Sequence, residues 1–151
     1  MSLRCTPLIQ LPGRAAEALE FYRGVFGGDV TVSLYRDKGL VETADADRVW
    51  HGQLHTPAGF TLSCIDMPCG AMYELGATVA ISLDGDDEAR LRSWFEALSD
   101  GGEVFVPLGF ASPVPEPGRV TDRFGVEWAV KIPTLEVAQP ATSAATVAPS
   151  S

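Results

Sequence analysis

Two histidines, four positions apart, are the only imidazole side chains of the chain. His51 and His55 flank Gln53 in segment 49–56. Successive side chains of a strand point to opposite faces, so these three polar side chains are expected to share one face of a sheet. The opposite face, against a helix, would then carry Trp50, Gly52 and Leu54. Because an imidazole titrates near neutral pH, His51 is the candidate acid or base, although a polar lining for a bound molecule accounts for the same pattern.

The same spacing argues against a metal ion shared by the two histidines. Positions i and i+4 of a strand lie about 13 Å apart, at about 3.3 Å per residue. A bond from zinc to a histidine nitrogen is only about 2.0–2.1 Å long. His51 and His55 are therefore expected to be neighbours on one surface and not two ligands of one ion.

A binding surface results if the neighbouring strands alternate in the same way. In segment 60–66, Thr61 and Ser63 would lie beside the histidines. The first strand would add Ile9 and Leu11 to the same cleft. The substrate-binding residues that this reasoning predicts are His51, Gln53, His55, Ser63, Thr61 and Ile9.

The elements that position these residues occur twice. Segments 13–29 and 88–104 each contain an amphipathic pattern followed by two glycines and an acid. The pairs Gly27-Gly28 and Gly101-Gly102 lie 74 positions apart. Repeated units of this kind usually pack together because one unit cannot bury its apolar face alone. The chain is therefore predicted to contain two related modules.

Apolar periodicity and turn residues give both halves the same order of elements. Each half has one helix with an apolar stripe at helical spacing. Each half also has four predicted strands, at 5–11, 30–35, 49–56 and 60–66, and then at 77–83, 103–108, 119–122 and 126–132. The predicted fold class is α+β, with two βαβββ modules at about 5–66 and 77–132 in one domain, 1–133. Loops are expected at 37–48 and 112–117, and residues 134–151, rich in Ala, Thr, Ser and Pro, are expected to form a mobile tail.

Composition limits the classes of partner. The chain has 151 residues, 46% of them hydrophobic, and a net charge of -9, which disfavours nucleic acid and anionic membrane surfaces. The sequence pI is about 4.5 and the mean hydropathy is +0.10. No apolar run is long enough to span a bilayer, and the N-terminus lacks the apolar core of a signal peptide. A cytoplasmic location is expected.

The three cysteines are expected to be reduced thiols. Cys5, Cys64 and Cys69 are an odd number, and the chain has no CxxC motif. Cys64 is expected to be a buried apolar residue on the helix-facing side, whereas Cys69 follows Pro68 in a linker. Nucleophilic catalysis by either is not expected, because no histidine adjoins them in sequence.

The chain resembles the PhnB-like family, often labelled 3-demethylubiquinone methyltransferase-like. This family is part of the vicinal oxygen chelate superfamily, with glyoxalase I, bleomycin-resistance proteins and extradiol dioxygenases. The resemblance rests on four segments in family order: EALEFYRGVFGGDV, VWHGQLHTPAGFTLSCIDMP, WFEALSDGGEVFVPL and GRVTDRFGVEW. It implies a mixed sheet curled around a cleft, helices on the outer face, and a histidine at the position of His51. The chain has no glycine-rich nucleotide loop, so methyl transfer is not expected.

The resemblance also implies four metal-ligand positions on the strands. Aligned with this chain, they fall on Pro7, Ser63, Ala129 and a position near Thr78. None of these residues is a strong ligand for a divalent transition metal. The sequence therefore predicts a cleft without a metal, and no other cofactor is indicated.

Three functions remain open at this stage. The first is a homodimeric protein of the glyoxalase/bleomycin resistance type that binds, and thereby sequesters, a small organic molecule. The second is a metal-independent enzyme on a small organic substrate that uses His51 as acid or base. The third is a metal-dependent lyase, isomerase or dioxygenase, for which the chain would need ligands that the alignment does not supply.

Overall fold

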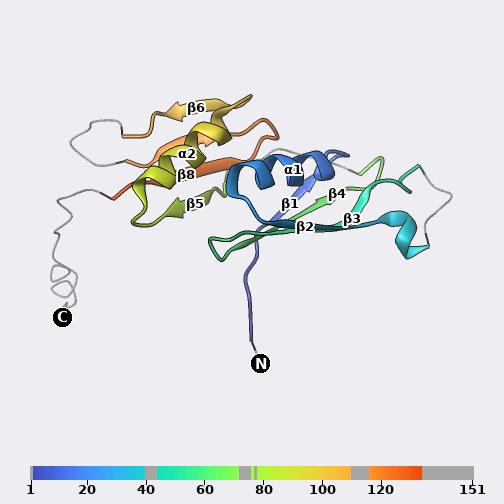
Figure 1. Ribbon diagram of the computed structural model, residues 1–151. Coiled ribbons are helices and arrows are strands. Elements are labelled where there is room, and N and C mark those ends of the chain that lie inside the picture. Colours follow the sequence, from blue (N-terminus) through green and yellow to red (C-terminus); the bar gives the residue numbers. More distant parts are fainter. Residues whose placement is uncertain (1, 40–43, 72–75, 77, 110–115, 134–151) are drawn as a thin grey trace, which may run out of the picture.

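A computed structural model describes residues 2–39, 44–71, 76, 78–109 and 116–133 of the chain (Figure 1). The first module contains β1 (Leu8–Leu11), α1 (Ala15–Phe26), β2 (Asp29–Leu34), the short 3-10 helix η1 (Tyr35–Lys38), β3 (Val49–His55) and β4 (Thr61–Asp66). The second contains β5 (Ile81–Asp84), α2 (Glu88–Ser99), β6 (Glu103–Val106), β7 (Gly118–Thr121) and β8 (Glu127–Lys131). The predicted tail, 134–151, and most of the predicted loop 112–117 lie outside the described residues.

Each module forms its own four-stranded mixed sheet. The strand orders are β1-β4-β3-β2 and β5-β8-β7-β6, with β1 parallel to β4 and β5 parallel to β8. Both helices lie on the same side of the two sheets, which sit side by side (Figure 1). The predicted α+β class with two βαβββ modules is confirmed. Neither described helix has the length and apolar character needed to cross a bilayer.

The repeated double glycine has a structural cause that is the same in both modules. Gly27 and Gly101 adopt φ values of +76° and +79°, which side-chain-bearing residues rarely adopt. A Cβ on Gly28 would overlap the carbonyl oxygen of His55, and a Cβ on Gly102 would overlap that of Thr121. The first glycine of each pair therefore lets the chain turn sharply after the helix. The second lets the backbone pass close to the end of the module's third strand.

An aromatic cluster around Tyr22 of α1 joins the modules. The Tyr22 ring lies 6.0 Å from the Phe124 ring and 5.6 Å from the Trp128 ring, centroid to centroid. The Tyr22 hydroxyl donates to Asp122 Oδ2 at 2.6 Å, and Trp128 Nε1 donates to the same oxygen at 2.9 Å. Asp122 Oδ1 accepts from the backbone N–H groups of Phe124 and Val126 at 2.9 and 3.0 Å. Four donors thus satisfy a carboxylate that is only 3% exposed, and the first module is tied to a turn of the second.

The predicted position of Trp50 on the helix-facing side is wrong. Ser33 pairs with His51 and Leu34 pairs with Val49, so Trp50 is an extra residue in β3, a β-bulge. Trp50 and His51 are both exposed, and burial resumes at the next residue. Trp50 is 45% exposed, and its ring packs edge-on against that of Tyr35. The bulge shifts the alternation by one residue, which strict alternation along the strand could not anticipate.

The first strand also presents the opposite face from the one expected. Ile9 and Leu11 are buried in the helix-facing core, while Leu8 and Gln10 are exposed. Leu8 pairs with Ser63, and Ser63 pairs with Gln53, so these three residues share the side away from the helices. The expectation that Ile9 and Leu11 line the same sheet face as the histidines is therefore wrong.

Candidate functional site

Five of the six predicted binding residues form one polar patch on the helix-free face of the first sheet. We use "polar patch" for His51, Gln53, His55, Thr61 and Ser63. Gln53 Nε2 donates to Ser63 Oγ at 3.3 Å, and His55 Nδ1 lies 3.1 Å from Thr61 Oγ1. His51 and His55 are exposed, whereas Ser63 is only 6% exposed beneath its neighbours. The patch can donate and accept hydrogen bonds at several neighbouring points.

A second feature, which the sequence did not predict, is a groove where the modules meet. Among the described strands, β1 and β5 are each an edge strand of their sheet, and residues of both line this junction. We call the groove between them the seam. It contains two cavities, of about 470 and 540 Å³, and both are lined by Pro7 and Ile81. Volumes of this size match those of sites for small organic ligands, about 300–1,000 Å³.

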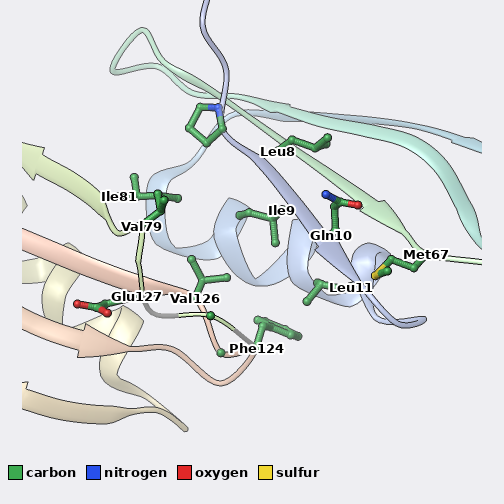
Figure 2. A pocket seen from close by; sticks show the side chains of 13 residues that line it. Leu8, Ile9, Gln10, Leu11, Met67, Val79, Ile81, Phe124, Val126 and Glu127 are labelled. Carbon is green, nitrogen blue, oxygen red and sulfur yellow. The ribbon is translucent and has the colours of Figure 1, made fainter. Parts of the chain in front are cut away.

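The first cavity runs along the open edge of β1 (Figure 2). Because it follows an edge, it is lined from both faces of that strand, including the buried Ile9 and the exposed Leu8. The second module contributes Val79, 78% exposed, and the turn residues Phe124 and Val126. Most of its lining is therefore apolar.

The second cavity is the counterpart of the first along the open edge of β5. Its lining comes from β5, from residues 4–7 before β1, from the turn 58–62, and from Trp94 of α2. Thr61 is among these residues, so the polar patch adjoins this cavity through the contact between Thr61 and His55. Of the predicted binding residues, Ile9 thus lines the first cavity and Thr61 the second.

The internal repeat relates the two cavities. Pro7 and Ile81 are 74 positions apart, the same offset as the glycine pairs. The turns are equivalent as well, because Thr56 N–H donates to the Phe60 carbonyl just as Asp122 N–H donates to that of Val126. Ile81, and not Thr78, is consequently the counterpart of Pro7. The seam has an approximate twofold relation centred between Pro7 and Ile81.

These positions do not suit a metal ion. Two of the four family ligand positions, Pro7 and Ile81, offer no side-chain donor atom, and Ala129 offers none either. Ser63 supplies one hydroxyl, which already contacts Gln53. In the described parts of the chain, no three His, Cys, Asp or Glu residues are grouped as a metal site would require. The described residues at the positions that the resemblance implies therefore do not match the donor set of such a metal site.

The cysteines differ in environment. Burial, together with the nearby Asp122 and Asp66 carboxylates, raises the pKa of the Cys64 thiol to about 12. Cys5 is exposed and lines the second cavity. Cys69 is exposed too, outside the linings of the two seam cavities, and its backbone N–H donates to Asp45. Cys64 is buried as predicted, and the chain carries one thiol in the seam and one beyond it.

Comparison with known proteins places the chain in a family. No protein-family profile and no curated protein matches it. Its structure is similar to that of protein PA1353 from Pseudomonas aeruginosa, at 31% identity over 87% of this chain and 98% of that one, with a TM-score of 0.74. It is also similar to a PhnB protein from Bacillus cereus, described as a putative 3-demethylubiquinone-9 3-methyltransferase, at 22% identity over 87% and 100% of the chains (TM-score 0.69). The chain belongs to the same family as PA1353, and its fold is that of the PhnB protein, in agreement with the resemblance to the PhnB-like family seen in the sequence.

The PhnB-like fold extends to more distant relatives. The fosfomycin resistance protein FosX from Listeria monocytogenes is 11% identical, over 93% of this chain and 98% of its own, with a TM-score of 0.56. At this identity the similarity concerns the fold alone. The family resemblance seen in the sequence is thus confirmed, and the ligand or reaction must be argued from the site itself.

Proposed function

We propose that this PhnB-like protein binds a small organic molecule in the seam between its modules. The observation that carries the proposal is the pair of adjoining cavities, each of ligand size, along the edge strands β1 and β5. Such a site needs apolar walls and a few polar groups to fix orientation. The walls come from both modules, and the polar groups come from the seam and the adjoining polar patch.

The polar patch would orient the bound molecule. Thr61 lines the second cavity and contacts His55, and Ser63 lies between Leu8 of the seam and Gln53 in the sheet register. A ligand group leaving the second cavity would therefore meet hydroxyl, imidazole and amide groups in succession. Sequestration of the molecule requires nothing more than this, and it is the function that we propose first.

A second candidate is a metal-independent enzyme with His51 as acid or base. It is favoured by the exposure of His51 on the helix-free face, next to the bulge at Trp50. In that case His51→Ala would abolish turnover, whereas in a sequestering protein it would only weaken binding. Under either function we propose a cleft without a metal, so treatment with a chelator should leave the melting temperature unchanged.

We also propose that the protein is a homodimer. Exposed apolar residues remain on the strands outside the two seam cavities, among them Trp50, Val104 and Phe105. Large apolar side chains left in water mark interaction surfaces when they cluster. Light scattering of the purified protein should give twice the monomer mass, and a monomer mass would overturn this part of the proposal.

A thermal-shift screen of small organic molecules tests the binding site. A ligand at one hundred times its dissociation constant stabilises the folded state by about 2.7 kcal/mol, which raises the melting temperature. The variant Val79→Trp places a bulky ring in the first cavity, and Val32→Trp is its matched control, since Val32 is an exposed valine away from both cavities. Ligands of the seam should lose their effect in Val79→Trp and keep it in Val32→Trp. Equal shifts in both variants would place the site elsewhere.

A further inference from the structure

We propose that Thr61 and His55 form a nucleophile and its base at the second cavity, and that they transfer the acyl group of a small ester bound there. This activity goes beyond binding in the seam. It rests on the proposed function all the same, because the second cavity has to hold the ester. It gives the role of base to His55 in place of His51.

The hydroxyl of Thr61 connects the second cavity with an imidazole. Thr61 lines this cavity, and its Oγ1 lies 3.1 Å from Nδ1 of His55. A hydroxyl within hydrogen-bond reach of an imidazole is the arrangement of an activated nucleophile and its base. Of the two histidines, only His55 has a side-chain hydrogen bond among the described residues. A molecule in the second cavity would therefore be within reach of Thr61 and, through it, of His55.

The fold does not require an imidazole at this point. Thr61 and His55 correspond to Glu127 and Thr121, 66 positions later, and both pairs stand opposite each other in the strand register. Glu127 lines the first cavity, where it forms an ion pair with Arg119. At these positions the second module thus has a carboxylate neutralised by a cation, whereas the first module has a hydroxyl against an imidazole.

A carboxylate lies on the other side of the imidazole. His55 is the register partner of Asp29 on β2 and of Thr61 on β4, so the three residues form one row across the sheet. Directly opposed side chains have Cβ atoms about 4.5–5.5 Å apart. Asp29 and His55 are not in ion-pair contact in the described structure. Asp29 is therefore a positioning residue, which acts through His55 by favouring the imidazolium that forms when His55 takes a proton.

The second cavity also has a cation that no acid of the described residues neutralises. Arg4 lines it, whereas every other arginine of the chain forms an ion pair. The carboxylate of the same lining, Asp84, is the register partner of Lys131. A cation beside a reacting carbonyl stabilises the negative charge that develops on its oxygen. Arg4 is the residue of this lining that can do so.

The transfer has two balanced steps. In the tautomer with the ring proton on Nε2, His55 Nδ1 can accept the proton of Thr61 Oγ1 as this oxygen attacks the ester carbonyl carbon. The bond from that carbon to the alkoxy oxygen then breaks, and the alcohol leaves with the proton from His55. Water next attacks the acyl group on Thr61 and gives its proton to His55. His55 returns the proton to Thr61 Oγ1 as the carboxylic acid leaves.

p-Nitrophenyl acetate is a suitable probe, because release of its p-nitrophenolate is followed by absorbance. Peptide mapping by mass spectrometry should find an acetyl group on Thr61. Thr61→Val should abolish this adduct, and Thr61→Ser should retain it. His55→Gln keeps a polar side chain that cannot take the proton, and it should lower kcat/KM by about 10²-fold. Asp29→Asn should lower kcat several-fold and leave KM unchanged.

A second pair of variants tests whether the reaction occurs in the second cavity. Ser82→Trp places a bulky ring in this cavity at an exposed position. Val32→Trp is the matched control, away from both cavities. Acetylation of Thr61 should be lost in Ser82→Trp and unchanged in Val32→Trp. Melting temperatures close to that of the parent chain would show that the variants fold.

Several results would overturn the inference. They are an acetyl group on Cys5 but not on Thr61, a larger loss of rate in His51→Gln than in His55→Gln, acetylation of Thr61 that Ser82→Trp does not reduce, and release of p-nitrophenolate no faster than with free imidazole at the same concentration. If ligands from the thermal-shift screen still stabilise the parent chain and not Val79→Trp, the inference fails and the seam stands as the binding site. Equal shifts in Val79→Trp and Val32→Trp overturn the proposed function itself.

Discussion

Replacing Tyr22 by phenylalanine should lower the free energy of unfolding by about 1.5–3 kcal/mol, the range for a hydrogen bond to a charged group. The Tyr22 hydroxyl donates at 2.6 Å to a carboxylate oxygen of Asp122, and both residues are buried. Phenylalanine keeps the ring and its contacts with Phe124 and Trp128, so the change isolates the hydroxyl. The carboxylate retains three donors, which is why the loss should stay below that expected for removing Asp122 itself.

Tyr35 provides the matched control. It is a second buried tyrosine whose hydroxyl donates at 3.0 Å to a neutral acceptor, the backbone carbonyl of Asp66. Tyr35→Phe should therefore cost only about 0.5–1.5 kcal/mol. Urea denaturation of both variants, followed by fluorescence and circular dichroism, gives the two values from transitions of equal slope. A Tyr22→Phe variant no less stable than Tyr35→Phe would refute the argument that a charged, buried acceptor joins the modules.

Three further predictions concern the helix position Gly24, the exposed ring of Trp50 and the titration of the Cys64 thiol. Gly24→Ala should stabilise the protein by about 1 kcal/mol in thermal denaturation, because Gly24 lies inside α1 and an added Cβ would meet no atom within 4 Å. Trp50→Ala should cost about 1–2 kcal/mol, well short of a buried-core tryptophan, because Trp50 is half exposed and packs mainly on Tyr35; a loss above 4 kcal/mol would contradict the bulge. For Cys64, burial raises the folded pKa to about 12 from about 9, so the folded state keeps a proton that the unfolded chain loses. Its contribution to stability should therefore be complete below pH 9 and decline as the pH rises toward 12, and denaturation of Cys64→Ala across this range should show a shallower decline.

The sequence was most informative where one physical requirement recurs. The two glycine pairs predicted the modules because each pair performs the same task, a left-handed turn followed by a close approach to a strand end. The position of Gln53 beside Ser63 followed from alternation, since no bulge interrupts the strands between them. Alternation along β3 and β4 was therefore enough to predict the residues of the polar patch.

The rule that side chains alternate between the two faces of a strand gave wrong faces at two positions. In both cases the pairing with a neighbouring strand decides the face. The bulge at Trp50 is set by the register between β2 and β3, which segment 49–56 does not encode alone. For Ile9, a short strand with apolar residues on both faces left the buried face undetermined until the pairing with β4 fixed it. The seam was missed because its walls come from segments far apart in the sequence, such as 7–11 and 124–127 in the first cavity. The repeat offset of 74 was the one signal that could have matched Pro7 with Ile81.

The rate of alkylation of Cys5, measured against that of Cys69, tests most directly whether a ligand binds in the seam. Cys5 lines the second cavity, Cys69 is exposed outside both cavities, and Cys64 is buried with a pKa near 12, so it should remain unreactive at neutral pH. Mass spectrometry after brief exposure to iodoacetamide reads each site separately. A molecule that raises the melting temperature should slow modification of Cys5 and leave that of Cys69 unchanged. Equal protection of both thiols, or protection of neither by stabilising ligands, would contradict binding in the seam.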